Sequence, residues 1–375
     1  MTQNAPDMES AEERGSGRKR GRGVAALIAV VCFCLCFCLV FAVAQGLLVR
    51  KSVASGGSVN NVQNFWNEYR SMEPGTIDAL YVGSSVTYCN IDPMYIYNES
   101  GLATYVLGCA SMHYDEAYMT IKEALKTQHP KVVMLEASGF RYQDDGDESK
   151  YHLLTDQLPM LDPEKLGIVL ENDWASASDL PGFVLPLLRY HDRWSEVSEQ
   201  DVELLLNGTP MTYTRGHSFT FTQTEVAIDF YAQDSKWQPY QRSYTYLDKI
   251  VQLCQEEGIE LVLFKTPAKR WCVTYSQAAQ DYASANGLKF MEFYYELEQI
   301  GIDPSTDFRD DIGHMNQYGA EKFSSYLAHE VLPELGLQDH RGDEAFQRWS
   351  SEYDEYLAAR QAVYDWSLEN KDVVE

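Results

Sequence analysis

The stretch DALYVGSSVTYCNIDP, residues 78–93, contains the signal that decides the fold class. Its apolar run, ALYV, ends at a glycine that is followed by Ser84 and Ser85. A short apolar run without polar alternation predicts a strand covered on both faces, as in a parallel sheet between helices. Asp92 and Pro93 then supply an N-cap and a first helical residue. The helix that follows has a cap of its own, so capping alone does not explain the two serines.

The same alternation of short apolar runs and helical patterns continues along the chain. Further strands are expected at Ala103–Leu107, Val132–Leu135, Leu261–Phe264 and Phe290–Phe293. Amphipathic stretches at 115–128, 246–258 and 275–287 lie between them and predict helices. Strands that alternate with helices predict an α/β fold, with a mostly parallel sheet between two helical layers.

The N-terminal segment predicts attachment to a membrane. Residues 23–49 are almost entirely apolar and long enough to cross a bilayer, and the basic run RKRGRG precedes them. The excess of positive charge predicts that residues 1–22 form a cytoplasmic tail without regular structure and that the rest lies outside the cell. The competing interpretation is a signal peptide cleaved near the AVA at 42–44. Residues 50–75 are expected to form a linker.

Composition excludes one class of partner and leaves the redox state open. The chain has 56 acidic and 30 basic residues, a formal net charge of −26. Such a surface repels phosphate backbones, so we expect no binding of nucleic acid. Outside the apolar segment, Cys89, Cys109, Cys254 and Cys272 remain. An exported domain could pair them in two disulfides, or they could be buried free thiols.

Two segments depart from the alternating rhythm. Residues 142–243 are acidic and rich in tyrosine, tryptophan and proline, and we interpret them as an insertion in a domain spanning 76–340. Residues 341–375 place aromatic side chains at helical spacing, which predicts a C-terminal helical extension that packs by its aromatic stripe.

A second chemical signal lies near the end of the domain, in DFRDDIGHMNQYG, residues 307–319. A serine hydroxyl becomes a nucleophile when an imidazole takes its proton and a carboxylate fixes the imidazole's tautomer. Asp311 and His314 supply both groups from one loop, just before Asn316, a residue suited to cap a helix. The aspartates could instead join His314 as metal ligands, but no second ligand cluster completes such a site, so we expect no metal.

Gly108 follows the second predicted strand, in VLGCAS. Its backbone N–H could be presented to a developing oxyanion at the same edge of the sheet as Ser85. The alternative is a glycine required only for a tight turn.

These motifs and their order resemble the SGNH/GDSL hydrolase superfamily, over roughly residues 76–335. The resemblance is closest to its membrane-anchored, exported branch, typified by the D-alanyl-lipoteichoic acid biosynthesis protein DltD. It rests on the N-terminal apolar segment, on Gly-Ser-Ser at 83–85, and on the closing segment with Asp311, His314, Asn316 and Gly319. The segments RYHDRW and LFKTPAKRW also resemble parts of exported members of this superfamily.

The resemblance implies a flavodoxin-like three-layer α/β/α domain that uses no cofactor. It makes Ser85 the nucleophile, His314 the general base and Asp311 its orienter. The backbone N–H groups of Ser85 and Gly108 would form the oxyanion hole.

Two positions depart from the superfamily pattern. Ser84 replaces the aspartate of Gly-Asp-Ser, and no asparagine follows the third strand, where VVMLEASGF places Glu136 and Ser138. A carboxylate there would oppose an oxyanion. It must therefore point away, pair with a cation such as Lys265 or Arg270, or mark a different chemistry.

The sequence thus predicts a membrane-anchored, extracytoplasmic acyltransferase or esterase. Its expected substrate is a cell-envelope glycan or a polyol polymer of the teichoic-acid kind, and the resemblance implies an acyl-exporting membrane protein as partner. Residues expected to bind substrate are Ser84, His113, Glu136, His191 and Lys265. The alternative is a catalytically silent envelope protein that uses the same fold to bind glycan or a membrane partner.

Overall fold

The computed structural model describes residues 9–49 and 62–370, which fall into two compact units. The smaller unit contains helix α1, Glu9–Leu48, together with residues 186–208. The larger unit contains the described residues up to 185 and from 209 onward. Each unit is described separately below.

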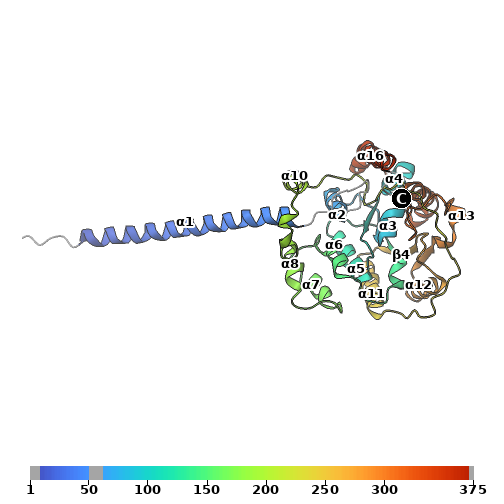
Figure 1. Ribbon diagram of the computed structural model, residues 1–375, viewed down its shortest axis with the longest axis horizontal. Helices are drawn as coiled ribbons and strands as arrows, with labels where there is room; N and C mark the ends of the chain where they lie inside the picture. The colour runs from blue at the N-terminus through green and yellow to red at the C-terminus, as the bar shows by residue number, and fades with distance from the viewer. Residues whose placement is uncertain (1–8, 50–61, 371–375) are drawn as a thin grey trace, which may run out of the picture. The chain divides into compact units, whose positions relative to one another are not determined.

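A five-stranded parallel sheet forms the centre of the larger unit (Figure 1). The strand order is β2-β1-β3-β4-β5, the doubly wound order of flavodoxin-like folds. All five strands lie within a residue or two of the ranges predicted from the sequence. They are β1 Ala79–Gly83, β2 Thr104–Gly108, β3 Val132–Glu136, β4 Glu260–Lys265 and β5 Lys289–Glu292. The predicted α/β fold class is confirmed.

Helices cover both faces of this sheet. The chain moves from β1 to β2 in one direction along the sheet, and from β2 through β3 and β4 to β5 in the other. Because parallel crossovers are right-handed, α4 lies on one face and α5, α11 and α12 on the other. On the α4 face, α3, α4 and α14 pack together, while α5 packs along α11.

The bounds of the helices in the larger unit follow the chain. The α-helices are α2 Val62–Ser71, α3 Ser85–Asn90, α4 Pro93–Ser100, α5 Tyr114–Ala124, α6 Glu148–Thr155, α7 Pro163–Leu170, α8 Leu180–Val184, α11 Gln241–Glu256, α12 Val273–Asn286, α13 Leu297–Ile300, α14 Gln317–Tyr326, α15 Gln347–Ser351 and α16 Tyr353–Glu369. Shorter turns are η1 Ala137–Arg141, η3 Phe293–Tyr295, η4 Leu327–Val331, η5 Pro333–Leu335 and η6 Glu344–Phe346.

Two predicted caps are confirmed. Asp92 caps α4, with its Oδ1 accepting from the backbone N–H of Tyr95 at 3.1 Å. Asn316 caps α14, with its side-chain oxygen accepting from the backbone N–H groups of Tyr318 and Gly319. Each cap satisfies donors that the first turn of a helix leaves without an intrahelical acceptor.

The predicted linker 50–75 is wrong in its second half. Helix α2 begins at Val62 and buries Phe65, Trp66 and Tyr69 in the core. The Tyr69 and Tyr105 rings meet edge to face at 5.0 Å, which ties α2 to β2. Residues 50–61 lie outside the described part of the chain. The aromatic spacing of α2 was the missed signal, because a flexible linker does not need a helical stripe of large side chains.

The N-terminal segment differs from the prediction, whereas the C-terminal segment packs as expected. Residues 9–22 were expected to lack regular structure but belong to α1, which begins at Glu9; residues 1–8 lie outside the described part. The C-terminal extension packs by its aromatic residues as predicted. Trp349 is fully buried, stacks on Tyr97 at 5.2 Å and donates its Nε1–H to the Thr76 carbonyl.

The segment expected to be one insertion is divided between the two units. Residues 186–208 form α9 Pro186–Tyr190, the turn η2 His191–Ser195 and α10 Glu199–Asn207, which pack against α1. The remainder belongs to the larger unit. Cys89, Cys109, Cys254 and Cys272 are buried free thiols, so the structure settles their pairing against disulfides.

Candidate active site

The carboxyl end of β1 places Ser84 and Ser85 at the edge of the sheet. Gly83 ends the strand close to Glu136 of β3: a Cβ on Gly83 would lie 2.4 Å from the Glu136 Cβ. Only glycine allows this approach. Helix α3 starts at Ser85, and the Ser84 side chain accepts no hydrogen bond from that helix. Ser84 therefore occupies the N-cap position without capping the helix through its side chain, and its hydroxyl is available for other contacts.

The Ser85 hydroxyl lies against His314, which comes from the loop before α14. Ser85 Oγ is 2.6 Å from His314 Nε2, and His314 Nδ1 is 2.7 Å from Asp310 Oδ2. Because an ionised carboxylate only accepts, Nδ1 carries a proton in this arrangement. In a neutral imidazole Nε2 is then the acceptor, and Ser85 donates to it. The structure thus brings the two residues together across more than two hundred positions of sequence.

The carboxylate that contacts the ring is Asp310 rather than Asp311, so the sequence prediction is wrong by one residue. Asp310 Oδ1 accepts from the backbone N–H groups of Ile312, Gly313 and His314, at 3.1, 3.1 and 3.2 Å. This turn leaves Oδ2 free to reach the imidazole. The Asp311 side chain is exposed. An aspartate that precedes a glycine-containing turn often accepts from backbone N–H groups two residues on, and this was the signal that favoured Asp310.

Hydrogen bonding keeps Asp310 ionised. Burial alone would raise the pKa of its carboxyl group, but the hydrogen bonds and charge of His314, with the nearby Arg309, bring the pKa down to about 2. A carboxylate that stays negative accepts a hydrogen bond from Nδ1 and so holds the ring in the tautomer whose Nε2 faces Ser85. The series Ser85–His314–Asp310 therefore has the geometry that lets an imidazole accept a hydroxyl proton.

Ser85 and His314 open into a cavity of about 230 Å³. Its lining comes from the start of α3, from the end of β4, from the segments that follow β2, β3 and β4, from α6 and from the loop before α14: Ser84, Ser85, Val86, Ser111, Ser138, Arg141, Tyr142, Lys150, Lys265, Ala268, Arg270, Ile312 and His314. Gly108 is not part of this lining. A Cβ there would lie 2.7 Å from Tyr88 Cδ1, so the glycine serves close packing at the end of β2. Ser111, three residues later, faces the cavity instead.

Glu136 pairs with a cation, one of the three outcomes that the sequence allowed. Its Oε1 accepts from Lys265 Nζ at 2.5 Å and from Ser138 Oγ at 3.0 Å. Its Oε2 accepts from the Ser138 backbone N–H at 3.0 Å and lies 3.4 Å from Ser84 Oγ. Both charged side chains are 1% exposed. Burial lowers the pKa of Lys265, and Glu136 opposes that shift. The carboxylate is thus neutralised beside the cavity.

The two histidines expected to bind substrate lie elsewhere. His113 precedes α5 and stacks on Tyr142 at 4.1 Å, behind the cavity wall that Tyr142 forms. Burial lowers the pKa of His113. His191 belongs to the smaller unit, where its exposed ring lies 2.7 Å from the Leu188 carbonyl oxygen. Of the five residues expected to bind substrate, Ser84 and Lys265 line the cavity, and Glu136 holds Lys265 in place.

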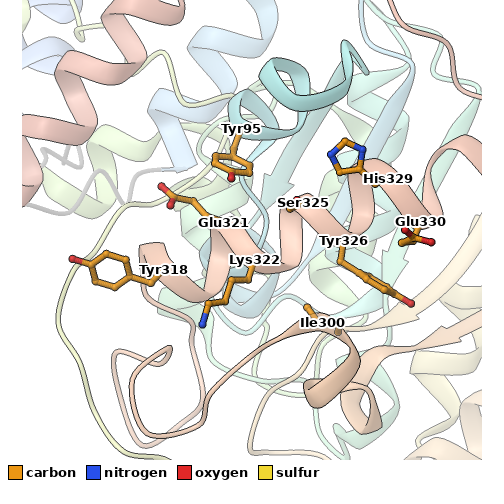
Figure 2. Close-up of a pocket in the computed structure, with 9 residues that line it drawn as sticks. All are labelled: Tyr95, Ile300, Tyr318, Glu321, Lys322, Ser325, Tyr326, His329 and Glu330. Atoms are coloured by element: carbon orange, nitrogen blue, oxygen red, sulfur yellow. The ribbon is translucent and has the colours of Figure 1, made fainter.

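A larger hollow, of about 520 Å³, lies along α14 and η4 (Figure 2). Three of its titratable side chains have partners outside the hollow: Lys322 bonds Asp307, Glu321 bonds Arg360, and His329 lies 3.4 Å from Glu99. Ser85 and His314 are not among its lining residues. The candidate active site is therefore the smaller cavity.

Comparisons with known proteins support no assignment beyond these observations. No family model and no curated protein matches the chain. The chain is similar to the crystal structure of a proposed acylhydrolase from Bacteroides fragilis, with 10% identity and a TM-score of 0.36 over 74% of this chain and 98% of that one. It is also similar to a gut microbial diltiazem-metabolizing enzyme, with 15% identity and a TM-score of 0.25 over 72% of this chain and 49% of that one. At these values the likeness says nothing about activity, so the function is argued from the residues of the chain.

Proposed function

We propose that the protein is a serine-dependent acyl-transfer enzyme, an esterase or O-acyltransferase. The observation that carries this proposal is the 2.6 Å contact between Ser85 Oγ and His314 Nε2, backed by Asp310. His314 takes the hydroxyl proton as Ser85 attacks an ester carbonyl, and it returns that proton to the departing alcohol. The acyl-serine is then released to water or to a hydroxyl group of an acceptor by the same proton transfer in reverse order.

The start of α3 suits stabilisation of the oxyanion formed in this reaction. The first N–H groups of a helix have no intrahelical acceptor, and Ser85 is the first residue of α3. Since Gly108 lies outside the cavity lining, we propose that Ser138 or Lys265 supplies the second donor from the opposite wall. Lys265 ends β4 and bonds Glu136 and Ser138, which occupy the place where the superfamily pattern has an asparagine, and its ammonium group would attract a developing negative charge.

We further propose that α1 is retained as a membrane anchor with the larger unit outside the cell. Among the described residues, Val24–Leu48 is the helix long and apolar enough to span a bilayer, a property that a signal sequence shares. The last residues of this helix contact other residues of the smaller unit. Arg193 Nη1 donates to the Leu48 carbonyl at 2.8 Å, and the Leu205 side chain packs against Gly46. Cleavage near the AVA at 42–44 would leave Gly46 and Leu48 in place, so these contacts fit both interpretations. The length of the apolar stretch favours an anchor, and with it an ester substrate of the cell envelope.

Hydrolysis of a simple ester tests the proposed activity. The full-length protein, purified in detergent, is expected to hydrolyse 4-nitrophenyl butyrate, and Ser85→Ala is expected to lower kcat/KM by about 10³-fold or more. Ser284→Ala, which removes an exposed hydroxyl on α12, is the matched control and is expected to leave the rate unchanged. Adding glycerol or a disaccharide and measuring the acylated product separates transfer from hydrolysis. A wild-type rate no higher than that of Ser85→Ala would reject an activated serine and favour a binding protein.

A further inference from the structure

The cavity beside Ser85 has a charge opposite to that of the rest of the molecule. Acidic residues outnumber basic ones by 56 to 30 in the chain, yet no aspartate or glutamate lines this cavity. Its charged lining residues are Arg141, Lys150, Lys265 and Arg270, and His314 adds a titratable ring. Low-dielectric walls concentrate the field of such a group of charges.

Three of these four cations are free to bind a ligand. Lys265 is neutralised by Glu136, at 2.5 Å. In the part of the chain that the structure describes, Arg141, Lys150 and Arg270 form no ion pair. A ligand could therefore contact these three cations without first breaking an ion pair.

The guanidinium of Arg141 packs on an aromatic ring, but its Nε–H has no acceptor among the described residues. Its guanidinium lies 4.9 Å from the centre of the Tyr142 ring, and Tyr142 in turn stacks on His113. Its Nε atom is buried and has no hydrogen-bond partner among the described residues. A buried donor without a partner costs free energy unless a ligand or water supplies an acceptor. The stack thus fixes the guanidinium at the cavity and leaves its Nε–H without an acceptor among the described residues.

Arg141 and Arg270 also line a neighbouring hollow of about 260 Å³. That hollow includes Lys269, and its one carboxylate, Asp234, accepts from Tyr275 Oη at 2.8 Å. The two arginines therefore face both spaces, at the position where a substrate that enters the Ser85 cavity would extend outward. Arginine presents several N–H donors in a plane, which suits carboxylate and phosphate oxygens.

We infer that the substrate is an ester that carries an anionic group, a carboxylate or a phosphate, bound by Arg141 and Arg270 while Ser85 attacks the carbonyl. Lys150, which is exposed on α6, adds positive charge at the same cavity. This inference rests on the proposed function, because it assigns a substrate class to the same serine. It excludes neutral glycan esters as the preferred substrates.

Pairs of esters that differ in charge test this inference on the full-length protein. For the acyl side, 4-nitrophenyl hemisuccinate is compared with 4-nitrophenyl butyrate. For the alcohol side, 1-acetylglycerol 3-phosphate is compared with 1-acetylglycerol. We expect kcat/KM to be at least about tenfold higher for the anionic member of one pair, since a charge-assisted hydrogen bond contributes roughly that factor. The pair that shows the preference identifies the side that carries the anion.

Variants separate this inference from the proposed function. Arg141→Gln/Arg270→Gln is expected to abolish the preference, measured as the ratio of kcat/KM for the anionic and the neutral member of the pair. Arg341→Gln, which removes an exposed arginine paired with Asp339, is the matched control and should keep the full preference.

Equal rates for both members of both pairs in an active wild type would overturn the inference alone. A preference that survives in the double variant would overturn the assignment of the two arginines. Absence of Ser85-dependent turnover of every ester would reject the proposed function, and the inference with it.

Discussion

Two carboxylates at the same edge of the sheet, Asp310 and Glu136, bind different partners: Asp310 contacts the His314 ring, and Glu136 pairs with Lys265. Asp310 lies in a loop, is 31% exposed, and uses one oxygen for backbone N–H groups and the other for His314. Glu136 ends a buried strand, and its oxygens are occupied by Lys265 and by Ser138. A carboxylate can orient an imidazole only if an oxygen remains free to reach it. The comparison shows why Asp310, with its short side chain in a turn, can accept from the His314 ring, whereas the buried Glu136 accepts from Lys265.

The largest expected effect is a loss of activity on substitution of Asp310 that substitution of the adjacent Asp311 does not cause. Asp310→Asn removes the acceptor that fixes the His314 tautomer, so kcat/KM for 4-nitrophenyl butyrate should fall by about 10³-fold or more. Asp311→Asn changes an exposed side chain and should stay within about twofold of wild type. Equal losses in both variants would mean that Asp310 has no special role, and a loss confined to Asp311→Asn would restore the original sequence prediction.

The next effect concerns stability rather than catalysis. Glu136→Gln leaves the Lys265 ammonium buried without its carboxylate, which should lower the free energy of unfolding by about 3 kcal/mol in urea titrations. Glu260→Gln breaks an exposed pair with Lys289 and should cost less than about 1 kcal/mol. Adding Lys265→Met to Glu136→Gln should recover most of the loss. A cost for Glu136→Gln no larger than that for Glu260→Gln would contradict a charged, buried pair.

The smallest expected effect is the dependence of stability on pH at Asp310. Its pKa in the folded protein is about 2, below the value of roughly 3.9 for an unfolded aspartate. The folded state therefore binds fewer protons, and this group adds stability that is fully present above about pH 4 and is lost as the pH falls toward 2. The difference in unfolding free energy between wild type and Asp310→Asn should shrink over that interval. A difference that grows on acidification would have the wrong sign.

The fold could be predicted well because the residue pattern of a strand indicates whether one or both of its faces are buried. A run such as ALYV at 79–82 has no polar alternation, which predicts a strand covered on both faces, and β2, β3 and β4 follow the same rule. The caps Asp92 and Asn316 are equally local, since each side chain bonds the first turn of its own helix. Helix α2 was missed although the helical spacing of Phe65, Trp66 and Tyr69 is visible in the sequence; only its packing against β2 depends on contacts that the sequence does not show.

The site was predictable in part for a related reason. Strand order brings Ser85 and the loop of His314 to one edge, so their meeting follows from topology. Which of two adjacent aspartates reaches the ring depends on the turn between them, and Asp310 is selected by three backbone N–H groups. The cationic lining was beyond prediction, because Arg141 and Arg270 lie far apart in sequence and meet only through the cavity. The separation of residues 186–208 from the rest of the insertion likewise depends on contacts with α1.

Reaction with a fluorophosphonate probe tests the central claim, that His314 activates Ser85, most directly. The probe labels an activated serine without any assumption about the substrate. Purified full-length protein, Ser85→Ala, His314→Ala and the control Ser284→Ala would be labelled side by side, and the modified peptide identified by mass spectrometry. The account predicts labelling on Ser85 in wild type and control, and none in the two site variants. Undiminished labelling of His314→Ala, or no labelling of a folded wild type, would contradict it.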